Sequence, residues 1–157
     1  MARVALELQP CCGNRSGIGT YTHELACRLE DHDGLEFQGN LFNFLGRNDN
    51  SAALTGMSMP IAQCSSLPYG VYRRIWHSVP VRYDRLFPRA DLTLFFNYIV
   101  PPCIGGKVAT TVYDLTYLRF PETMERRNYR RIDRDLAYSV DRSERIITIS
   151  DFVGQEL

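Results

Sequence analysis

Short apolar segments separated by polar turns run along the chain and predict alternating strands and helices. The first strand is expected around residues 4–8, and apolar residues then recur at the spacing of one helical face over 18–29. Ser16 is suited to cap this helix, which is expected to end near Gly34. The alternating segment 35–44 predicts a second strand. A strand, helix and strand in this order favour a parallel α/β sheet.

The remaining pattern extends the same architecture. Residues 45–68 have no clear period and are expected to form a loop with one short strand near Ile61. Three further strands are expected at 92–96, 107–112 and 145–149, and two helices at 122–140 and from Ser150 onward. The charged face of the helix at 122–140 is typical of a solvated surface with i, i+4 ion pairs. The elements together predict a three-layer, Rossmann-like α/β domain with a mostly parallel sheet.

Composition narrows the classes of protein. The 157 residues are 45% hydrophobic and 23% charged, which suits one ordinary globular domain, and 18 basic residues balance 18 acidic ones, so nucleic acid is not the expected partner. The longest apolar runs are too short for a membrane span or a signal peptide, so we expect a cytoplasmic protein. The five cysteines and three histidines lack metal-ligand spacing, and no metal is expected.

Candidate ligand-binding residues follow the strands. Ligands of an open parallel sheet collect beyond the carboxyl ends of its strands. A helix start with glycines lets a phosphate reach the free backbone N–H groups. The residues at such positions are Gly17, Ile18 and Gly19 for phosphate, Asn97, Tyr98 and Tyr113 for a second ligand, and Asp114 as a candidate catalytic group. Two alternatives stay open: the glycines merely form a tight turn, or Asp114 caps the turn that follows it.

The segment 69–89 interleaves arginines with aromatic residues. Pro80 divides it, which predicts one helix before the proline and a second helical turn after it. Arginines among aromatics suit a surface that meets anionic lipid headgroups, so peripheral membrane contact is one hypothesis for this segment. The other is that the aromatics pack in the core and the arginines are solvated.

Three segments in sequence resemble the N-terminal half of a family 4 retaining glycosyltransferase with the two-domain GT-B fold. They are Ser16 to Leu25 (SGIGTYTHEL), Val112 to Glu122 (VYDLTYLRFPE) and Arg145 to Phe152 (RIITISDF). Each is weak alone, but their order and spacing match across nearly the whole chain. The resemblance implies that residues 1–157 form the acceptor-binding domain and that a C-terminal domain, absent from this chain, holds most of a nucleotide-sugar donor.

The resemblance also implies roles for residues. Gly17, Ile18 and Gly19 would approach the donor diphosphate and stabilise the charge that builds on the leaving phosphate. The acceptor would be a glycan or a lipid-linked molecule, as in the biosynthesis of cell-envelope polysaccharides, and the nucleotide-sugar is a substrate, so no cofactor is expected. Many members have a His-Asp pair where this chain has Tyr113 and Asp114. The histidine is missing, so its role in the family does not carry over. The residues expected to bind the acceptor are Asn97, Tyr98 and Tyr113, and Asp114, which matches the family pattern, is the expected catalytic group.

Two other classes remain possible on the same residues. A glycine-rich turn after the first strand is also typical of dinucleotide-binding Rossmann domains, but Thr22 stands at the third glycine and no acid ends the second strand to hold a ribose. A non-catalytic interaction module would also accommodate Tyr113 in place of the family histidine.

Overall fold

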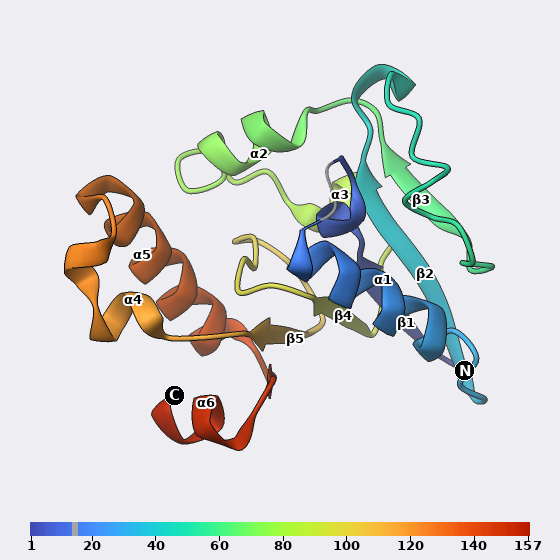
Figure 1. Ribbon diagram of the computed structural model, residues 1–157. Helices are drawn as coiled ribbons and strands as arrows, with labels where there is room; N and C mark the ends of the chain where they lie inside the picture. Colours follow the sequence, from blue (N-terminus) through green and yellow to red (C-terminus); the bar gives the residue numbers. More distant parts are fainter. Residues whose placement is uncertain (14–15) are drawn as a thin grey trace.

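The computed structural model of the chain describes residues 1–13 and 16–157, and for residues 127, 128 and 131 the backbone only. It is an α/β domain in which helices flank a central sheet (Figure 1). The strands are β1 (Ala2–Glu7), β2 (Leu35–Phe42), β3 (Ile61–Cys64), β4 (Leu92–Phe95), β5 (Lys107–Val112) and β6 (Arg145–Thr148). The α-helices are α1 (Gly17–Leu29), α2 (Tyr69–Ile75), α3 (Tyr83–Leu86), α4 (Thr116–Arg119), α5 (Arg126–Arg142) and α6 (Asp151–Glu156). Short 3-10 helices span Gln9–Cys11, Phe44–Gly46 and Pro121–Thr123.

All six strands are parallel, in the order β3-β2-β1-β4-β5-β6. The chain therefore builds outward from β1 to β3, returns to place β4 on the other side of β1, and builds outward again. This confirms the predicted Rossmann-like architecture. It also places the topological switch point between β1 and β4, where open α/β sheets bind ligands.

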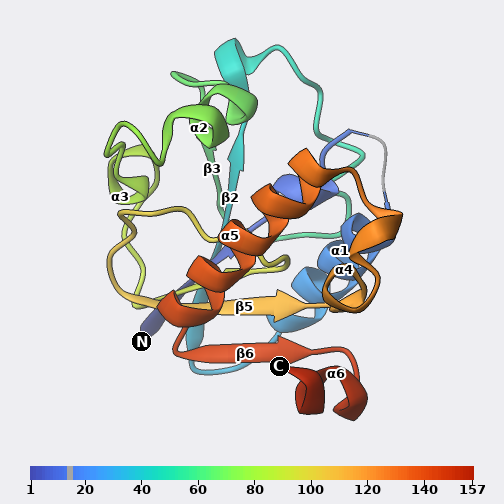
Figure 2. The ribbon, with the colours of Figure 1, turned by 90° about the vertical axis from the view of Figure 1, so that its left-hand side faces the viewer.

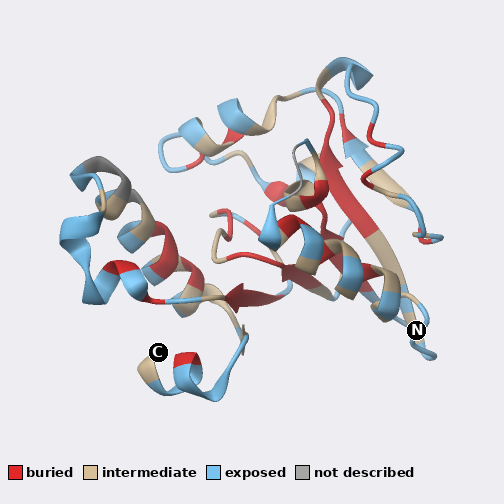
Figure 3. Cartoon of the chain, viewed as in Figure 1, coloured by how far each residue is buried: buried red, intermediate tan, exposed pale blue. Residues whose placement is uncertain are grey.

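The two faces of the sheet carry separate apolar cores, because neighbouring strand residues point to opposite sides. Leu94 and Ala109 belong to the core under α1, whereas their neighbours Phe95 and Val108 belong to the core under α2, α3 and α5. Helix α5 packs against β5 (Figure 2). Burial is concentrated in the strands and on the inward sides of the helices (Figure 3).

Several predicted boundaries need correction. Helix α1 ends at Leu29, five residues before Gly34, and Gly34 instead forms the turn into β2 with a φ of 90°. Helix α5 begins at Arg126 and not at residue 122, because Pro121 starts a separate 3-10 turn and Met124 is extended. The second strand ends at Phe42, two residues before the predicted end. The short strand at Ile61 and the division of the segment 69–89 around Pro80 are confirmed.

The turn into β5 depends on Gly106, which adopts a left-handed φ of 75°. A Cβ atom at this position would lie 2.9 Å from the backbone oxygen of Ala90. We expect Gly106→Ala to lower the free energy of unfolding by about 1–3 kcal/mol, because both the backbone conformation and the close contact oppose a side chain. Chemical denaturation measures this.

Gly70→Ala is the matched control. Gly70 lies in α2, where an added Cβ meets nothing within 4 Å. Alanine is favoured over glycine in a helix by about 0.5–1 kcal/mol, so the control is expected to be neutral or stabilising. Equal destabilisation by the two substitutions would contradict this account of the turn.

Candidate functional site

The N-terminus of α1 lies at the carboxyl edge of the sheet, as predicted. Ser16 caps the helix: its Oγ accepts a hydrogen bond from the Gly19 N–H at 3.2 Å. Gly19 is buried, whereas Gly17 is exposed and Ile18 is half-buried. Within the part of the chain that the structure describes, no hydrogen bond is found to the N–H groups of Gly17 and Ile18. The N–H groups of Gly17 and Ile18 are therefore available to an anion, whereas the N–H of Gly19 is bonded to the Ser16 cap.

Tyr113 connects the end of β5 to the first turns of α1. Its hydroxyl donates to the backbone oxygen of Phe96 at 2.6 Å, and its ring meets Tyr21 edge to face at 5.4 Å between centroids. Burial raises the pKa of the Tyr113 hydroxyl far above its ordinary value, with a smaller contribution from Tyr21. The phenol is thus a neutral donor with a backbone partner, and it holds α1 against the ends of β4 and β5.

Asn97 and Tyr98 follow β4 at the same edge. The Asn97 side chain is 9% exposed, and its Oδ1 accepts a hydrogen bond from the Ile99 N–H at 2.9 Å. Its backbone oxygen accepts one from Thr110 Oγ1 at 2.6 Å. These bonds give Asn97 a structural role in the turn. Tyr98 is half-buried against the apolar cluster that includes Leu115 and Leu136. Contact of Asn97, Tyr98 or Tyr113 with an acceptor stays a prediction.

Asp114 is exposed at the carboxyl edge, and its Oδ1 accepts a hydrogen bond from the Thr116 N–H at 3.0 Å. This is the turn-capping geometry considered above as the alternative to catalysis. The bond orients the carboxylate at the start of α4 and leaves its remaining lone pairs open to solvent. A role in catalysis stays a prediction.

Glu7 is the residue that sequence reasoning missed. It ends β1 at the switch point, paired in register with Asn40 and Phe95, and is only 4% exposed. One carboxyl oxygen accepts the Gln9 N–H at 3.2 Å, and Oε2 has no hydrogen-bond partner among the described residues. Burial raises the pKa of Glu7 from 4.5 to about 8, although the Gln9 bond and the charge of Arg73 oppose the rise. The sequence feature that could have indicated this buried acid is the glutamate within the otherwise apolar run VALEL.

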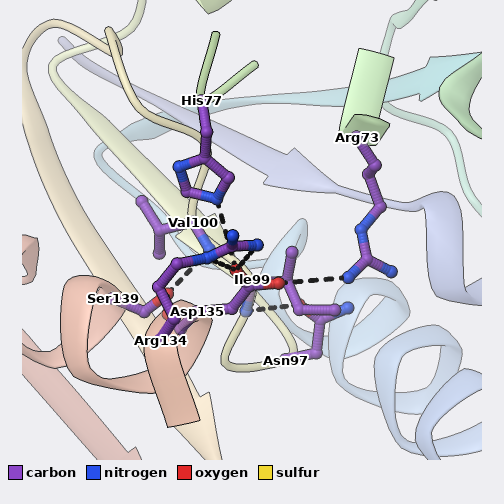
Figure 4. Close-up of polar contacts among 8 residues, drawn as sticks. All are labelled: Arg73, His77, Asn97, Ile99, Val100, Arg134, Asp135 and Ser139. Carbon is purple, nitrogen blue, oxygen red and sulfur yellow. Dashed lines mark hydrogen bonds and ion pairs between the residues drawn. The ribbon is translucent and has the colours of Figure 1, made fainter. Parts of the chain in front are cut away.

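A second buried acid joins the helices on the face of the sheet that is covered by α2 and α5 (Figure 4). Asp135 of α5 is 6% exposed, and its carboxylate accepts hydrogen bonds from three cationic or ionisable side chains. Arg73 donates at 3.5 Å, Arg134 at 3.1 and 3.2 Å, and His77 Nε2 lies at 3.3 Å. The arrangement ties α2 and the residues after it to α5.

Ser139, one turn along α5, extends this connection to the loop after β4. Its hydroxyl donates to the backbone oxygen of Asp135 at 2.6 Å and accepts the Val100 N–H at 2.9 Å. Helix α5 is therefore fixed both to α2 and to the turn that contains Asn97 (Figure 4).

The segment 69–89 supplies core as well as charge. Its aromatic side chains are largely buried, at Tyr72, Trp76, Tyr83 and Phe87, and pack on the face covered by α2 and α3. The exposed part of the pattern is therefore its arginines, and the aromatic part belongs to the core. No described helix is long and apolar enough to cross a membrane.

A cavity of about 450 Å³ lies at the start of α5, and none of the site residues predicted from sequence is in its lining. It is lined by Pro121, Glu122, Met124, Arg126, Tyr129 and Arg130. The residues that the structure describes contain no group of three or more histidine, cysteine or acidic side chains placed to hold a metal ion.

Comparisons with known protein families, with curated proteins and with solved structures gave no match. The resemblance to glycosyltransferases therefore depends on the three sequence segments alone.

The buried Glu7 predicts a pH dependence of stability. Between about pH 4.5 and 8 the folded protein retains a proton that the unfolded chain has released, so stability falls as the pH rises through this window. The slope is at most about 1.4 kcal/mol per pH unit. Glu7→Gln removes this titration, so its stability relative to the unsubstituted protein is expected to grow toward pH 8. Denaturation at several pH values measures the slope, and Glu144→Gln, on an exposed side chain, should leave it unchanged.

Asp135→Asn is expected to lower the free energy of unfolding by about 1.5–3 kcal/mol, because it replaces charge-assisted hydrogen bonds to two arginines by weaker neutral ones. Asp133→Asn is the control on the exposed side of the same helix and should change stability by no more than about 0.5 kcal/mol. Equal effects in urea denaturation would show that Asp135 does not connect α2 to α5.

Proposed function

We propose that this chain is the acceptor-side half of a retaining glycosyltransferase of the GT-B type, which uses a nucleotide-sugar donor. The observation that carries the proposal is the open start of α1. The N–H groups of Gly17 and Ile18 meet the carboxyl edge of a parallel sheet with no partner among the described residues. Backbone donors at a helix N-terminus suit a diphosphate.

The chemistry expected of these residues is electrostatic. In transfer from a nucleotide-sugar, negative charge accumulates on the leaving diphosphate as the bond to the sugar breaks. Fixed N–H donors stabilise this charge without reorganising, which is the action of an oxyanion hole. Tyr113 and Ser16 hold the start of α1 in place, the first through Tyr21 and the second as the cap. Asp114, exposed after β5 and so two strands from β1 in the sheet order, is the proposed catalytic group.

Exposed apolar side chains support a second lobe beyond this edge. Leu118, Phe120, Ile149 and Phe152 are each about half exposed and lie on elements that follow the carboxyl ends of β5 and β6. Arg119 connects the two regions, since it pairs with Glu156 and lies 5.0 Å from the centre of the Phe152 ring. Apolar surface of this kind marks sites of contact with another domain or protein.

The dinucleotide-binding alternative is less well supported. Thr22, at the third glycine of that fingerprint, is fully buried, and its hydroxyl donates to the Ile18 backbone oxygen at 2.8 Å. The second strand ends in Phe42 and Asn43, so no acid stands there to bind a ribose.

Nucleotide binding tests the proposal. We expect UDP or GDP to shift the backbone amide signals of Gly17 and Ile18 in a ¹⁵N NMR titration of the chain. Gly17→Ala adds a methyl group where no atom lies within 4 Å, so it should fold normally and weaken binding about tenfold by keeping the phosphate away. Gly70→Ala is the control and should bind as the unsubstituted chain does. Tighter binding of NAD than of either nucleotide would favour the dinucleotide-binding domain.

The isolated chain should show no sugar transfer in an assay with nucleotide-sugars, because the resemblance assigns most of the donor site to the second domain. Robust transfer by residues 1–157 alone would contradict the half-enzyme proposal. Binding of UDP without turnover is the expected combination.

A further inference from the structure

The cavity at the start of α5 carries a concentration of positive charge that the fold does not neutralise. Arg126 and Arg130 line it together and are both exposed. Neither side chain forms an ion pair or hydrogen bond with any residue that the structure describes, whereas the side chains of Arg134 and Arg142 on the same helix bond to Asp135 and to backbone oxygens. Both side chains are exposed, as expected, but the expected i, i+4 pairs are not formed at these two positions with any described residue.

Helix physics opposes this placement of charge. Arg126 is the first residue of α5, where the macrodipole is positive and a cation is disfavoured. Arg130 stands four residues later, at the distance where like charges on a helix repel. The first turn contains no acidic residue. A bound anion would offset both the unfavourable interaction of Arg126 with the helix dipole and the repulsion between Arg126 and Arg130.

The rest of the lining limits the kind of anion. The cavity, at about 450 Å³, falls in the range of small-molecule sites and exceeds the volume of a lone phosphate ion. Tyr129 gives it an aromatic wall that meets Tyr117, and Met124 and Pro121 add apolar surface. Glu122 is the one acid in the lining and suits a hydroxyl donor. An arginine pair for phosphate, with an acceptor and an apolar wall beside it, fits a phosphorylated polyhydroxy compound.

We propose that Arg126 and Arg130 bind the phosphate monoester of a phosphorylated sugar or polyol in this cavity. The cavity follows α4 beyond the carboxyl end of β5, on the same edge of the sheet as Gly17 and Asp114. The binding site is inferred from the cavity and the charges of its lining residues. Its assignment as the acceptor site rests on the proposed function. The acceptor would then carry a phosphate group on a molecule either free in solution or anchored in a lipid.

Titration with glucose 6-phosphate tests the site. Binding is measured by calorimetry and by changes in the NMR signals of the arginine Nε groups. Arg126→Gln with Arg130→Gln is expected to weaken binding at least about tenfold, since each charge-assisted bond contributes a large share of affinity. Arg85→Gln, on an exposed arginine of α3, is the control for lost surface charge and should leave affinity within about twofold. Equal affinity of the double variant and the control would overturn the proposal.

Vesicles of phosphatidylcholine with and without phosphatidic acid distinguish the two sources of the phosphate. If the phosphate belongs to a lipid, binding to the acidic vesicles is lost in the double variant and glucose 6-phosphate binds weakly. If it belongs to a soluble molecule, the sugar phosphate binds and vesicle binding does not depend on the two arginines. Failure of the double substitution to affect either ligand overturns the site.

The Gly17→Ala variant separates this inference from the proposed function. It should bind glucose 6-phosphate with unchanged affinity, because the sugar phosphate occupies a different site. Loss of that binding in Gly17→Ala would place the phosphate at α1 and would overturn the proposal. Absence of UDP binding, with binding of the sugar phosphate still dependent on the two arginines, would refute the proposed glycosyltransferase and leave the phosphate site standing.

Discussion

The parallel alignment of all six strands is the constraint on which the candidate site depends. Because the strands share one direction, every connection must return from the carboxyl edge to the amino edge, and the segment that follows each strand begins at the carboxyl edge. The start of α1, the turn at Asn97, the pair Tyr113 and Asp114, and the start of α6 therefore meet the same edge although they are far apart in sequence. Reversal of any one strand would remove its loop from this group.

The face under α2 contains two buried acids whose surroundings differ in charge. Asp135 accepts hydrogen bonds from two arginines and a histidine, which make it a connection between helices. Glu7 lies at the switch point with a backbone N–H on one oxygen and no hydrogen bond to the other among the described residues, and burial favours its protonated form. A buried carboxyl group thus connects two helices at Asp135 and favours its protonated form at Glu7.

Sequence reasoning recovered the architecture because it depends on local periodicity and on strand direction. Ser16 and Ser150 were recognised as helix caps, and both accept the expected hydrogen bonds. Boundaries were less accurate where one residue changes the backbone, as Pro121 does before α5.

The partners of the site residues were beyond reach of the sequence. Asp135 meets Arg73 and His77 across 62 and 58 residues, and no spacing rule connects positions so distant. The use of the Gly19 amide by its own cap could have been expected from Ser16, since a cap at this position takes the third amide of the helix. The burial of Glu7 could be predicted only with knowledge of the full strand order, because its neighbours in the sheet come from β2 and β4.

The outermost strands of the sheet, β3 and β6, have only four residues each. The unpaired backbone of an edge strand can recruit a strand from another molecule, and a short edge offers few bonds for such an addition. The domain therefore keeps its long, apolar strands inside and confines its exposed pairing groups to two brief segments. This arrangement disfavours edge-to-edge pairing between copies of the domain.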